Sequence, residues 1–557
     1  MRPEPGAIRS VVSCACLLAA AAGGCNAIIG LEVGELAPSQ SGADAASASS
    51  SGGPGAGGSG AGGEGTGGAG GGDGGGGGSG GDGGGGGGSG GNGGGSGGGG
   101  SGGGGPLCSD AEGTVVEPSA SWGETLGFDV GDLAASDGAL TAVITEVLAS
   151  GAFRFSVAKW TSGGENDSRY GLSANDVWGL HLAAGDGATY VAGEAAGATS
   201  LPGGLLDACR VGPALVATSY TTSFVAALDA NGRCGWAWSV DAQHNTTARA
   251  MAANSEAVVF AVDVTDAGRS FGPCELKSVP AESALLAALY PADGACKWQQ
   301  RLGPRAAVTV KALPVNPKAS GNLVTVVGDY ESLGGAVTFG GQTPFASEQR
   351  DVFVARYTAI DGALVDLTTL NVEGDQQVAQ HGAALLPGGD VVIAGSYRGV
   401  VDFGGGCPAL PDAGDTESFF VARVSRKGVV WSRGFGDDKE SQVAAGVAVD
   451  GAGAIYVTGE FTGTIPLGSA GSLTTSQKRA GFLMRLDAQG NLISATKVEG
   501  AGTVALRVVA VDGALGGPVY VAGAVTGALH LDGLAAPLGS ESDNESRGFI
   551  ARLSGAR

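Results

Sequence analysis

Two short motifs recur along the chain with the same spacing, and this regularity constrains the fold more than any other feature of the sequence. The first motif is an apolar pair, then usually Ala, then often a basic residue. Its seven copies lie 61 to 68 residues apart, centred on Ala158, Ala226, Ala287, Ala355, Ala422, Met484 and Ala551. The second motif ends in a Gly that recurs every 64 to 69 residues, at Gly193, Gly328, Gly395, Gly459 and Gly523, with Val262 replacing it once. Two motifs with one period predict a repeat protein.

Each repeat consists of short β-rich runs separated by Gly, Asp and Asn, without helical periodicity. Four short strands per repeat, arranged radially, form a β-propeller. We therefore predict an all-β chain with seven four-stranded blades, with six or eight blades as the alternatives.

The two ends of the domain predict how the ring closes. The last copy of the first motif ends four residues before Arg557, so the last blade lacks an outer strand. An open end would leave an unpaired strand edge. We expect the segment around Ser119–Trp122 to supply the missing strand.

Several stretches resemble the bacterial seven-bladed β-propeller (SBBP-type) repeats of surface and secreted proteins. The resemblance is carried by Gly395–Gly404, Phe420–Val424, Trp431 and Gly446–Asp450. It is good over residues 305–557 and fair over 176–304. It implies a fold and a location, but this family has no shared catalytic residues to transfer.

The N-terminus predicts export. Arg2 and Arg9 precede the apolar run Val11–Ala22, and two Gly separate that run from Cys25. The arrangement resembles a bacterial lipoprotein signal peptide over residues 1–24, in which Cys25 becomes the lipidated first residue. By that family's sorting habit, Asn26 implies the outer membrane. An ordinary secretory signal is the alternative. We expect a lipid-anchored protein of the bacterial cell envelope, at the outer membrane or cell surface.

A Gly/Ser-rich linker at 41–106 follows the mature anchor segment, 25–40. It has no apolar periodicity and cannot offset its ordering entropy, which predicts disorder. A flexible coil of this length spans roughly 45 Å. Residues 107–557 are left as the propeller domain.

The charge balance limits the partners. The net charge is −23, which argues against nucleic acid, since nucleic acid requires clustered basic residues. No apolar run reaches the ~20 residues of a spanning helix. We expect a monomeric domain that is attached to the membrane by its lipid and binds a protein or a glycan.

Six Cys remain after the signal peptide and the lipidated Cys25 are set aside. An exported chain meets oxidising conditions, so we expect pairing, with free buried thiols as the alternative. Two neighbouring repeats carry Cys at equivalent positions. The pattern predicts the disulfides Cys209–Cys234, Cys274–Cys296 and, by elimination, Cys108–Cys407.

A basic residue occupies one equivalent position in five repeats. These residues are Lys159, Arg356, Arg423, Arg485 and Arg552. A ring of cations that binds an anion is one interpretation. We favour the other, in which each basic residue forms an ion pair with a carboxylate of the next blade.

His181 and His381 lie 12 and 14 residues before the Gly of their repeats, which places them on innermost strands beside the channel. Two His could bind a metal, but these two are three repeats apart and no second ligand is close in sequence. We predict two isolated polar channel residues and no metal site. No nucleophile motif or calcium loop is present. We therefore predict no catalytic residues and no cofactor.

Fold alone does not determine the function of a propeller. The scarcity of His and the lack of an acid–base pair favour a non-enzymatic binding module displayed on the tether. The alternatives are an extracellular propeller enzyme (a lyase, a glycosidase or a quinoprotein-like dehydrogenase) and a scaffold for outer-membrane assembly.

Deleting residues 41–105 should leave the thermal midpoint of the domain nearly unchanged, because the linker is predicted to bury no apolar surface. Thermal unfolding of the full-length and shortened chains, followed by circular dichroism, measures the difference. A large drop in the midpoint would mean that the linker packs on the propeller.

Overall fold

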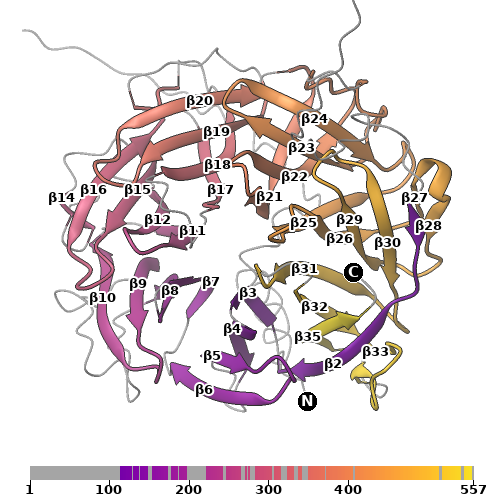
Figure 1. The fold of residues 1–557 in the computed structure, drawn as a ribbon, viewed down its shortest axis with the longest axis horizontal. Coiled ribbons are helices and arrows are strands. Elements are labelled where there is room, and N and C mark those ends of the chain that lie inside the picture. Colours follow the sequence, from indigo (N-terminus) through magenta and orange to yellow (C-terminus); the bar gives the residue numbers. More distant parts are fainter. Residues whose placement is uncertain are drawn as a thin grey trace, which may run out of the picture. The chain divides into compact units, whose positions relative to one another are not determined.

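In the computed structural model, the described strands form seven four-stranded antiparallel blades arranged around a centre (Figure 1). Two neighbouring blades are joined into one larger sheet by a parallel bridge between His381 and Gly446. The signal peptide, the anchor segment and the Gly/Ser-rich linker lie outside the described residues. The structure describes residues 113–127, 129–136, 138–147, 153–172, 177–185, 187–196, 221–241, 246–264, 270–271, 274–275, 283–303, 307–314, 323–331, 337–340, 349–370, 372–404, 408–513, 517–540 and 545–554.

The first four blades follow one another along the chain, each running from its innermost to its outermost strand. Blade 1 has β3 (Asp129–Ser136), β4 (Ala139–Val147), β5 (Phe153–Trp160) and β6 (Asn166–Leu172). Blade 2 has β7 (Val177–Gly185), β8 (Ala188–Ala196), β9 (Thr221–Leu228) and β10 (Cys234–Asp241). Blade 3 has β11 (Thr246–Ala253), β12 (Val258–Val264), β15 (Ser283–Leu289) and β16 (Cys296–Leu302). Blade 4 has β17 (Ala307–Ala312), β18 (Leu323–Glu331), β19 (Asp351–Thr358) and β20 (Leu364–Leu370).

The other three blades complete the ring. Blade 5 has β21 (Asp375–Leu385), β22 (Val391–Arg398), β23 (Ser418–Ser425) and β24 (Gly428–Phe435). Blade 6 has β25 (Gln442–Val449), β26 (Ile455–Phe461), β29 (Ala480–Leu486) and β30 (Leu492–Val498). Blade 7 has β31 (Val504–Val511), β32 (Val519–Thr526), β35 (Ser546–Ser554) and β2 (Ser119–Leu126).

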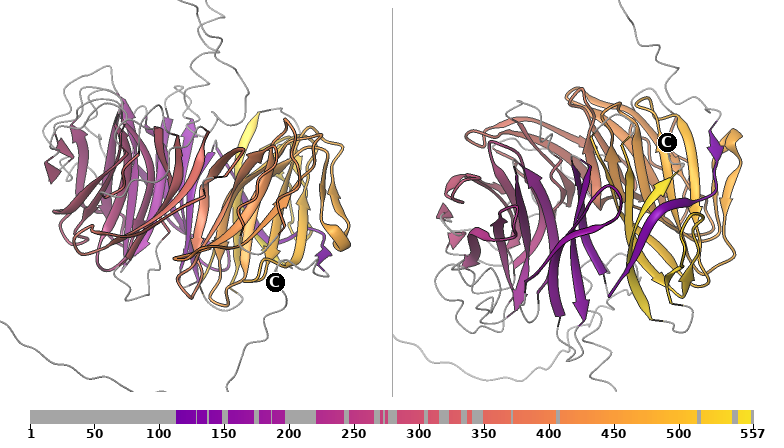
Figure 2. Two further views of the ribbon diagram at one scale, coloured as in Figure 1. Left: turned by 90° about the horizontal axis from the view of Figure 1, so that it is seen from above. Right: turned by 60° about the horizontal axis from the view of Figure 1, so that its bottom comes forward.

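Blade 7 takes its outer strand from the other end of the domain. Strand β2 pairs antiparallel with β35, from Ser119 opposite Ser554 to Leu126 opposite Gly548. This confirms both the seven-bladed architecture and the closing segment predicted from the sequence. Figure 2 shows β2 on the outside of the ring. The closure pairs an edge that would otherwise be exposed.

Several short strands lie outside the seven four-stranded blades. β1 (Thr114–Val115) adds in parallel to β30, and β13 (Ser270–Phe271) pairs with both β10 and β14 (Cys274–Glu275). Strand β27 (Thr464–Pro466) forms a small hairpin with β28 (Ser472–Thr474), and a 3-10 turn at Gly468–Ala470 lies between them. A second small hairpin consists of β33 (Ala528–Leu529) and β34 (Leu538–Gly539). Within the ranges given above, no helix has the length and apolar character needed to cross a membrane.

The hydrophobic core lies between blades rather than at one centre. The described residues form seven buried clusters, and each joins two neighbouring blades. For example, Phe155 of blade 1 packs with Phe224 of blade 2, and Phe419 of blade 5 stacks on Phe482 of blade 6 with ring centroids 4.7 Å apart. This explains why the strands are apolar on both faces.

The repeated Gly lies on the second strand of its blade, opposite a β-bulge in the innermost strand. Gly328 faces Val310 and Gly459 faces Ala444, and in each case the register shifts immediately afterwards. A Cβ at Gly328 would collide with the carbonyl oxygen of Thr309, and one at Gly459 with that of Val443. The Gly is therefore needed because the bulged strand approaches closely.

A Trp on the outermost strand contacts a turn of the next blade at four of the seven joints. The indole N–H of Trp431 donates to the carbonyl of Ala488 at 3.1 Å, and its ring covers Gly490. The other Trp–Gly pairs are Trp122 with Gly164, Trp236 with Gly294, and Trp298 with Gly362. Each of these Gly has a positive φ, between 68° and 84°. A side chain at these positions would be strained and would also meet the indole ring.

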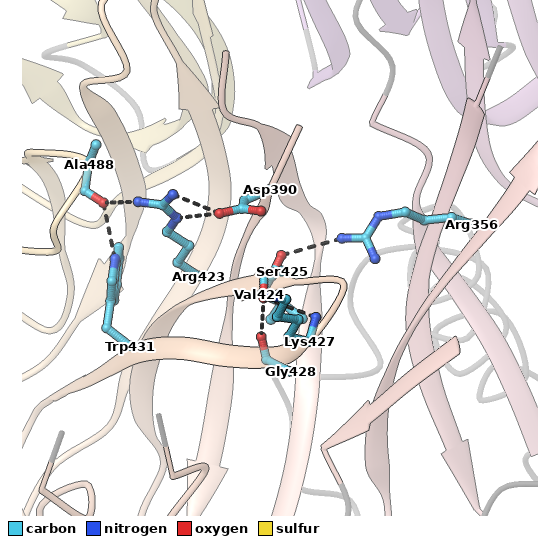
Figure 3. Close-up of polar contacts among 9 residues, drawn as sticks. All are labelled: Arg356, Asp390, Arg423, Val424, Ser425, Lys427, Gly428, Trp431 and Ala488. Carbon is cyan, nitrogen blue, oxygen red and sulfur yellow. Dashed lines mark hydrogen bonds and ion pairs between the residues drawn. The ribbon is translucent and has the colours of Figure 1, made fainter. Parts of the chain in front are cut away.

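The basic residues predicted to pair with the next blade bond differently (Figure 3). Arg423 lies 2.7 Å from Asp390, and Arg356 lies 2.6 Å from Asp366; both carboxylates belong to the arginine's own blade. The inter-blade contacts go instead to backbone carbonyls, from Arg423 to Ala488 at 3.0 Å and from Arg356 to Val424 at 3.4 Å. The prediction of inter-blade ion pairs was therefore wrong for these two residues.

Two of the three other basic residues, Arg485 and Arg552, also depart from that prediction. Arg485 lies over the ring of Tyr456, 5.7 Å from its centroid, within blade 6. Arg552 of blade 7 donates to the carbonyl of Ser162 in blade 1. For Lys159, which faces Thr141 and Ser168 in the strand register of blade 1, the inter-blade ion pair stays a prediction. For Arg356, Arg423 and Arg552, the physical reason is that the next blade presents a backbone carbonyl oxygen at this level, and this oxygen accepts a guanidinium N–H.

One predicted disulfide lies in the described residues. Cys274 and Cys296 are bonded, with Cα atoms 5.1 Å apart, and join β14 to the start of β16. This pairing is confirmed. Cys234 is also disulfide-bonded, and its predicted partner Cys209 lies outside the described residues. Cys108 and Cys407 lie outside them as well.

Replacing Gly490 by Ala should destabilise the domain more than replacing Gly399 by Ala. Both glycines have positive φ, 82° and 71°, so both variants bear a conformational cost of about 1–2 kcal/mol. Only at Gly490 would the new Cβ also meet a side chain, Trp431, at 2.8 Å. Overpacking at this joint should add about 1–3 kcal/mol.

Thermal and chemical unfolding of the two variants beside the wild type measure this difference. Equal losses at the two positions would show that the Trp–Gly contact does not stabilise the joint.

Candidate functional site

A cavity of about 170 Å³ occupies the centre of the propeller. All seven innermost strands, or the residues that directly follow them, contribute to its lining. Its polar side chains are Asp132, His181, Lys311, Gln380 and His381. These come from blades 1, 2, 4 and 5, so the ring unites residues separated by up to 249 positions in the sequence.

Three β-bulges of the innermost strands carry a basic residue, and one of these residues, Lys311, lines the cavity. Arg249, Lys311 and Arg507 each occupy the extra position of a bulge, on β11, β17 and β31. A bulge re-aims its side chain. These cations are matched by carboxylates: Arg249 lies 2.6 Å from Asp263, Lys311 3.8 Å from Asp329, and Arg507 2.6 Å from Asp129.

The Arg507–Asp129 pair joins blade 7 to blade 1. Both guanidinium contacts come from Nη1, at 2.8 Å to Oδ1 and 2.6 Å to Oδ2 of Asp129. The two residues are 378 positions apart in sequence, so this pair forms only when the ring closes.

Asp132 and His381 face each other from blades 1 and 5, with Oδ1 and Nδ1 3.6 Å apart. The carboxylate is held by two backbone N–H donors, Leu133 at 2.8 Å and Leu182 of blade 2 at 3.0 Å. Burial raises the pKa of Asp132, and the nearby His381 and the two N–H groups oppose that rise. The arrangement presents a fixed hydrogen-bond acceptor beside an imidazole.

His181 lies close to His381, with ring centroids 6.3 Å apart. Its Nε2 is 3.4 Å from the carbonyl oxygen of Ala248 in blade 3. Burial and the neighbouring His381 lower the pKa of His181 to about 3, so its ring is uncharged at neutral pH. A neutral imidazole can both donate and accept a hydrogen bond.

The sequence analysis correctly placed His181 and His381 beside the channel, but it predicted that they are isolated from each other. It placed both beside the channel, and the structure has both in the cavity lining, on β7 and β21. They are not isolated from each other, because strands three blades apart meet across the narrow channel. Over the described ranges, no group of three His, Cys, Asp or Glu residues is arranged to hold a metal ion.

Sequence reasoning missed Asp132, Lys311 and Gln380. Their distance to the Gly of the repeat varies with the length of the bulge and of the turn between the first two strands. The available signal was a charged or amide residue inside a run of small and apolar residues on an innermost strand.

No family model matches the chain, and no curated protein does. Among solved structures, a quinohemoprotein alcohol dehydrogenase from Pseudomonas putida HK5 is 10% identical, with a TM-score of 0.39, over 80% of this chain and 78% of that one. A europium-containing methanol dehydrogenase is 11% identical, with a TM-score of 0.35, over 78% of this chain and 93% of that one.

A sialidase from Trypanosoma rangeli, bound to the inhibitor DANA, is 10% identical, with a TM-score of 0.33, over 77% of this chain and 55% of that one. At these identities and TM-scores, no activity can be carried over to this chain. The propeller fold rests on its own strand pairing.

Asp329 should make the stability of the domain depend on pH. Burial raises its pKa to about 6 from the ordinary 3.8, so the folded state holds a proton more tightly than the unfolded chain between these values. Asp329 should therefore contribute a loss of free energy of unfolding as the pH rises from about 4 to 7. Relative to Asp329→Asn, which cannot ionise, the loss should be on the order of 2–3 kcal/mol.

Chemical unfolding of both proteins at several pH values measures the effect. In the variant, the Asn oxygen still accepts the N–H of Val378, which donates to Asp329 at 2.7 Å in the wild type. Asp415→Asn, at an exposed turn position, controls for the loss of one acidic group. Parallel pH profiles for Asp329→Asn and wild type would contradict the prediction.

Proposed function

We propose that this chain is a lipoprotein of the bacterial cell envelope that displays a β-propeller as a binding module on a flexible tether. The anchor is Cys25 and the tether is the Gly/Ser-rich linker of residues 41–106. The main support for the proposal is that β2 closes the ring, because β2 begins shortly after the end of the linker. A closed ring is a stiff platform, and its end loops are free to vary.

Support for binding at the loops comes from apolar side chains that the fold does not bury. Tyr290 and Ile360 lie in equivalent turns of blades 3 and 4, and 47% and 56% of their surfaces are exposed. Val400, in a turn of blade 5, is 57% exposed. Aromatic and aliphatic side chains in such positions are typical contact residues for a protein or glycan partner.

Cells that express the wild-type chain should incorporate a fatty-acid analogue into it, and Cys25→Ala should abolish the label. The reason is that Cys25 is the proposed acceptor of the lipid. Stable attachment requires more than one acyl chain. In-gel detection of the analogue measures the modification, with Cys14→Ala, inside the signal peptide, as the matched control.

Protease treatment of intact cells then tests display. Cleavage in the linker should release the propeller domain from wild-type cells. Equal labelling of wild type and Cys25→Ala, or a domain protected in intact cells and cleaved only after lysis, would count against surface display on a lipid anchor.

A further inference from the structure

We propose that the central channel binds one uncharged sugar ring, either a monosaccharide or the terminal unit of a glycan. This goes beyond the proposed binding at the loops and does not depend on the lipid anchor. The argument uses the size of the cavity, the arrangement of its polar and apolar walls, and its charge.

The size of the cavity suits a single ring. Its volume is about 170 Å³. A protein cavity of about 150 Å³ accepts a benzene molecule. The channel therefore has room for one six-membered ring, whose outer substituents can extend along the channel.

The walls of the cavity differ in polarity from blade to blade. Blades 6 and 7 contribute only Val447, Val508 and Val509, and blade 3 contributes Ala250 and Met251. The polar side chains come from blades 1, 2, 4 and 5. A sugar ring has the complementary character, because its C–H faces are apolar and its edge carries hydroxyl groups. Most of the exposed surface of the cavity is polar, which suits the hydroxyl groups of a sugar.

The polar side chains of the cavity can form hydrogen bonds with the hydroxyl groups of a sugar. Asp132 is an acceptor fixed by the N–H groups of Leu133 and Leu182, and it keeps oxygen lone pairs for a hydroxyl donor. A hydroxyl donating to a carboxylate forms a charge-assisted bond, which is stronger than a neutral one. His181 and His381 lie beside this carboxylate and can exchange hydrogen bonds with the next hydroxyl on the ring.

The charges of the channel favour an uncharged ligand. Lys311 lines the cavity and lies 3.8 Å from Asp329, whereas Arg249 and Arg507 are not part of the lining and pair with Asp263 and Asp129, each at 2.6 Å. An anionic ligand would meet Asp132 and would have to compete with Asp329 for Lys311, and a cationic ligand would meet Lys311. A neutral polyhydroxylated ring requires no counter-charge and can use the existing donors and acceptors.

The test uses the purified mature chain with D-glucose, D-galactose, D-mannose and N-acetyl-D-glucosamine as probes. Saturation-transfer NMR and calorimetry should detect at least one of them with a Kd of about 1 mM or tighter. Asp132→Asn and His381→Ala should each weaken that binding about tenfold or more, as expected for lost hydrogen bonds to a charged or well-placed partner. His530→Ala, an exposed His outside the channel lining, should bind like wild type.

Two further measurements keep the test decisive. If Asp132→Asn lowers the thermal midpoint, His381→Gln replaces it, because Asp132 also accepts two backbone N–H groups and His381 does not. D-glucuronate and D-glucosamine, the charged relatives, should bind more weakly than the neutral sugar. The proposal is overturned if no probe binds at about 10 mM, if the channel variants bind like wild type, or if a charged sugar binds best.

Discussion

The burial of apolar side chains between neighbouring blades is the interaction on which the rest of this structure depends. Each sheet is apolar on both faces, so a single blade leaves both of its faces uncovered, and only a closed ring covers all of them. The joint between blades 7 and 1 is the critical one, because it brings together strands from the two ends of the domain. Strand β2 and the Arg507–Asp129 pair both form there.

Neighbouring blades are held together by one recurrent contact, which a different contact replaces at one joint. At four joints a Trp covers a Gly with positive φ in the next blade, and the residue two positions later often adds a bond, as Arg433 does to the carbonyl of Gly490 at 3.0 Å. In blade 4, Asp366 stands in register where other blades have the Trp, and it lies 3.6 Å from Arg426 of blade 5. An ion pair there replaces the aromatic contact.

The channel follows from the same repeated architecture. A Gly on each of several second strands permits the innermost strand to bulge against it, and in blade 4 the bulge residue, Lys311, lines the cavity. The lining residues differ between blades: blades 1, 2, 4 and 5 contribute polar side chains, and blades 3, 6 and 7 contribute apolar ones. Function in such a fold is decided by these few side chains, because the rest of each strand is committed to packing.

The class of fold, the seven blades, the closing strand and the Cys274–Cys296 disulfide could all be predicted from the amino-acid sequence. This was possible because these follow from spacing along the chain: a constant period, a missing strand at one end and equivalent Cys positions in two repeats. The contacts of Arg423 with Asp390 and a backbone carbonyl became evident only in the folded chain. The same holds for the proximity of His381 to Asp132 and to His181. These contacts depend on bulge register and on distances across the channel, and neither quantity is written in the separation of residues along the chain.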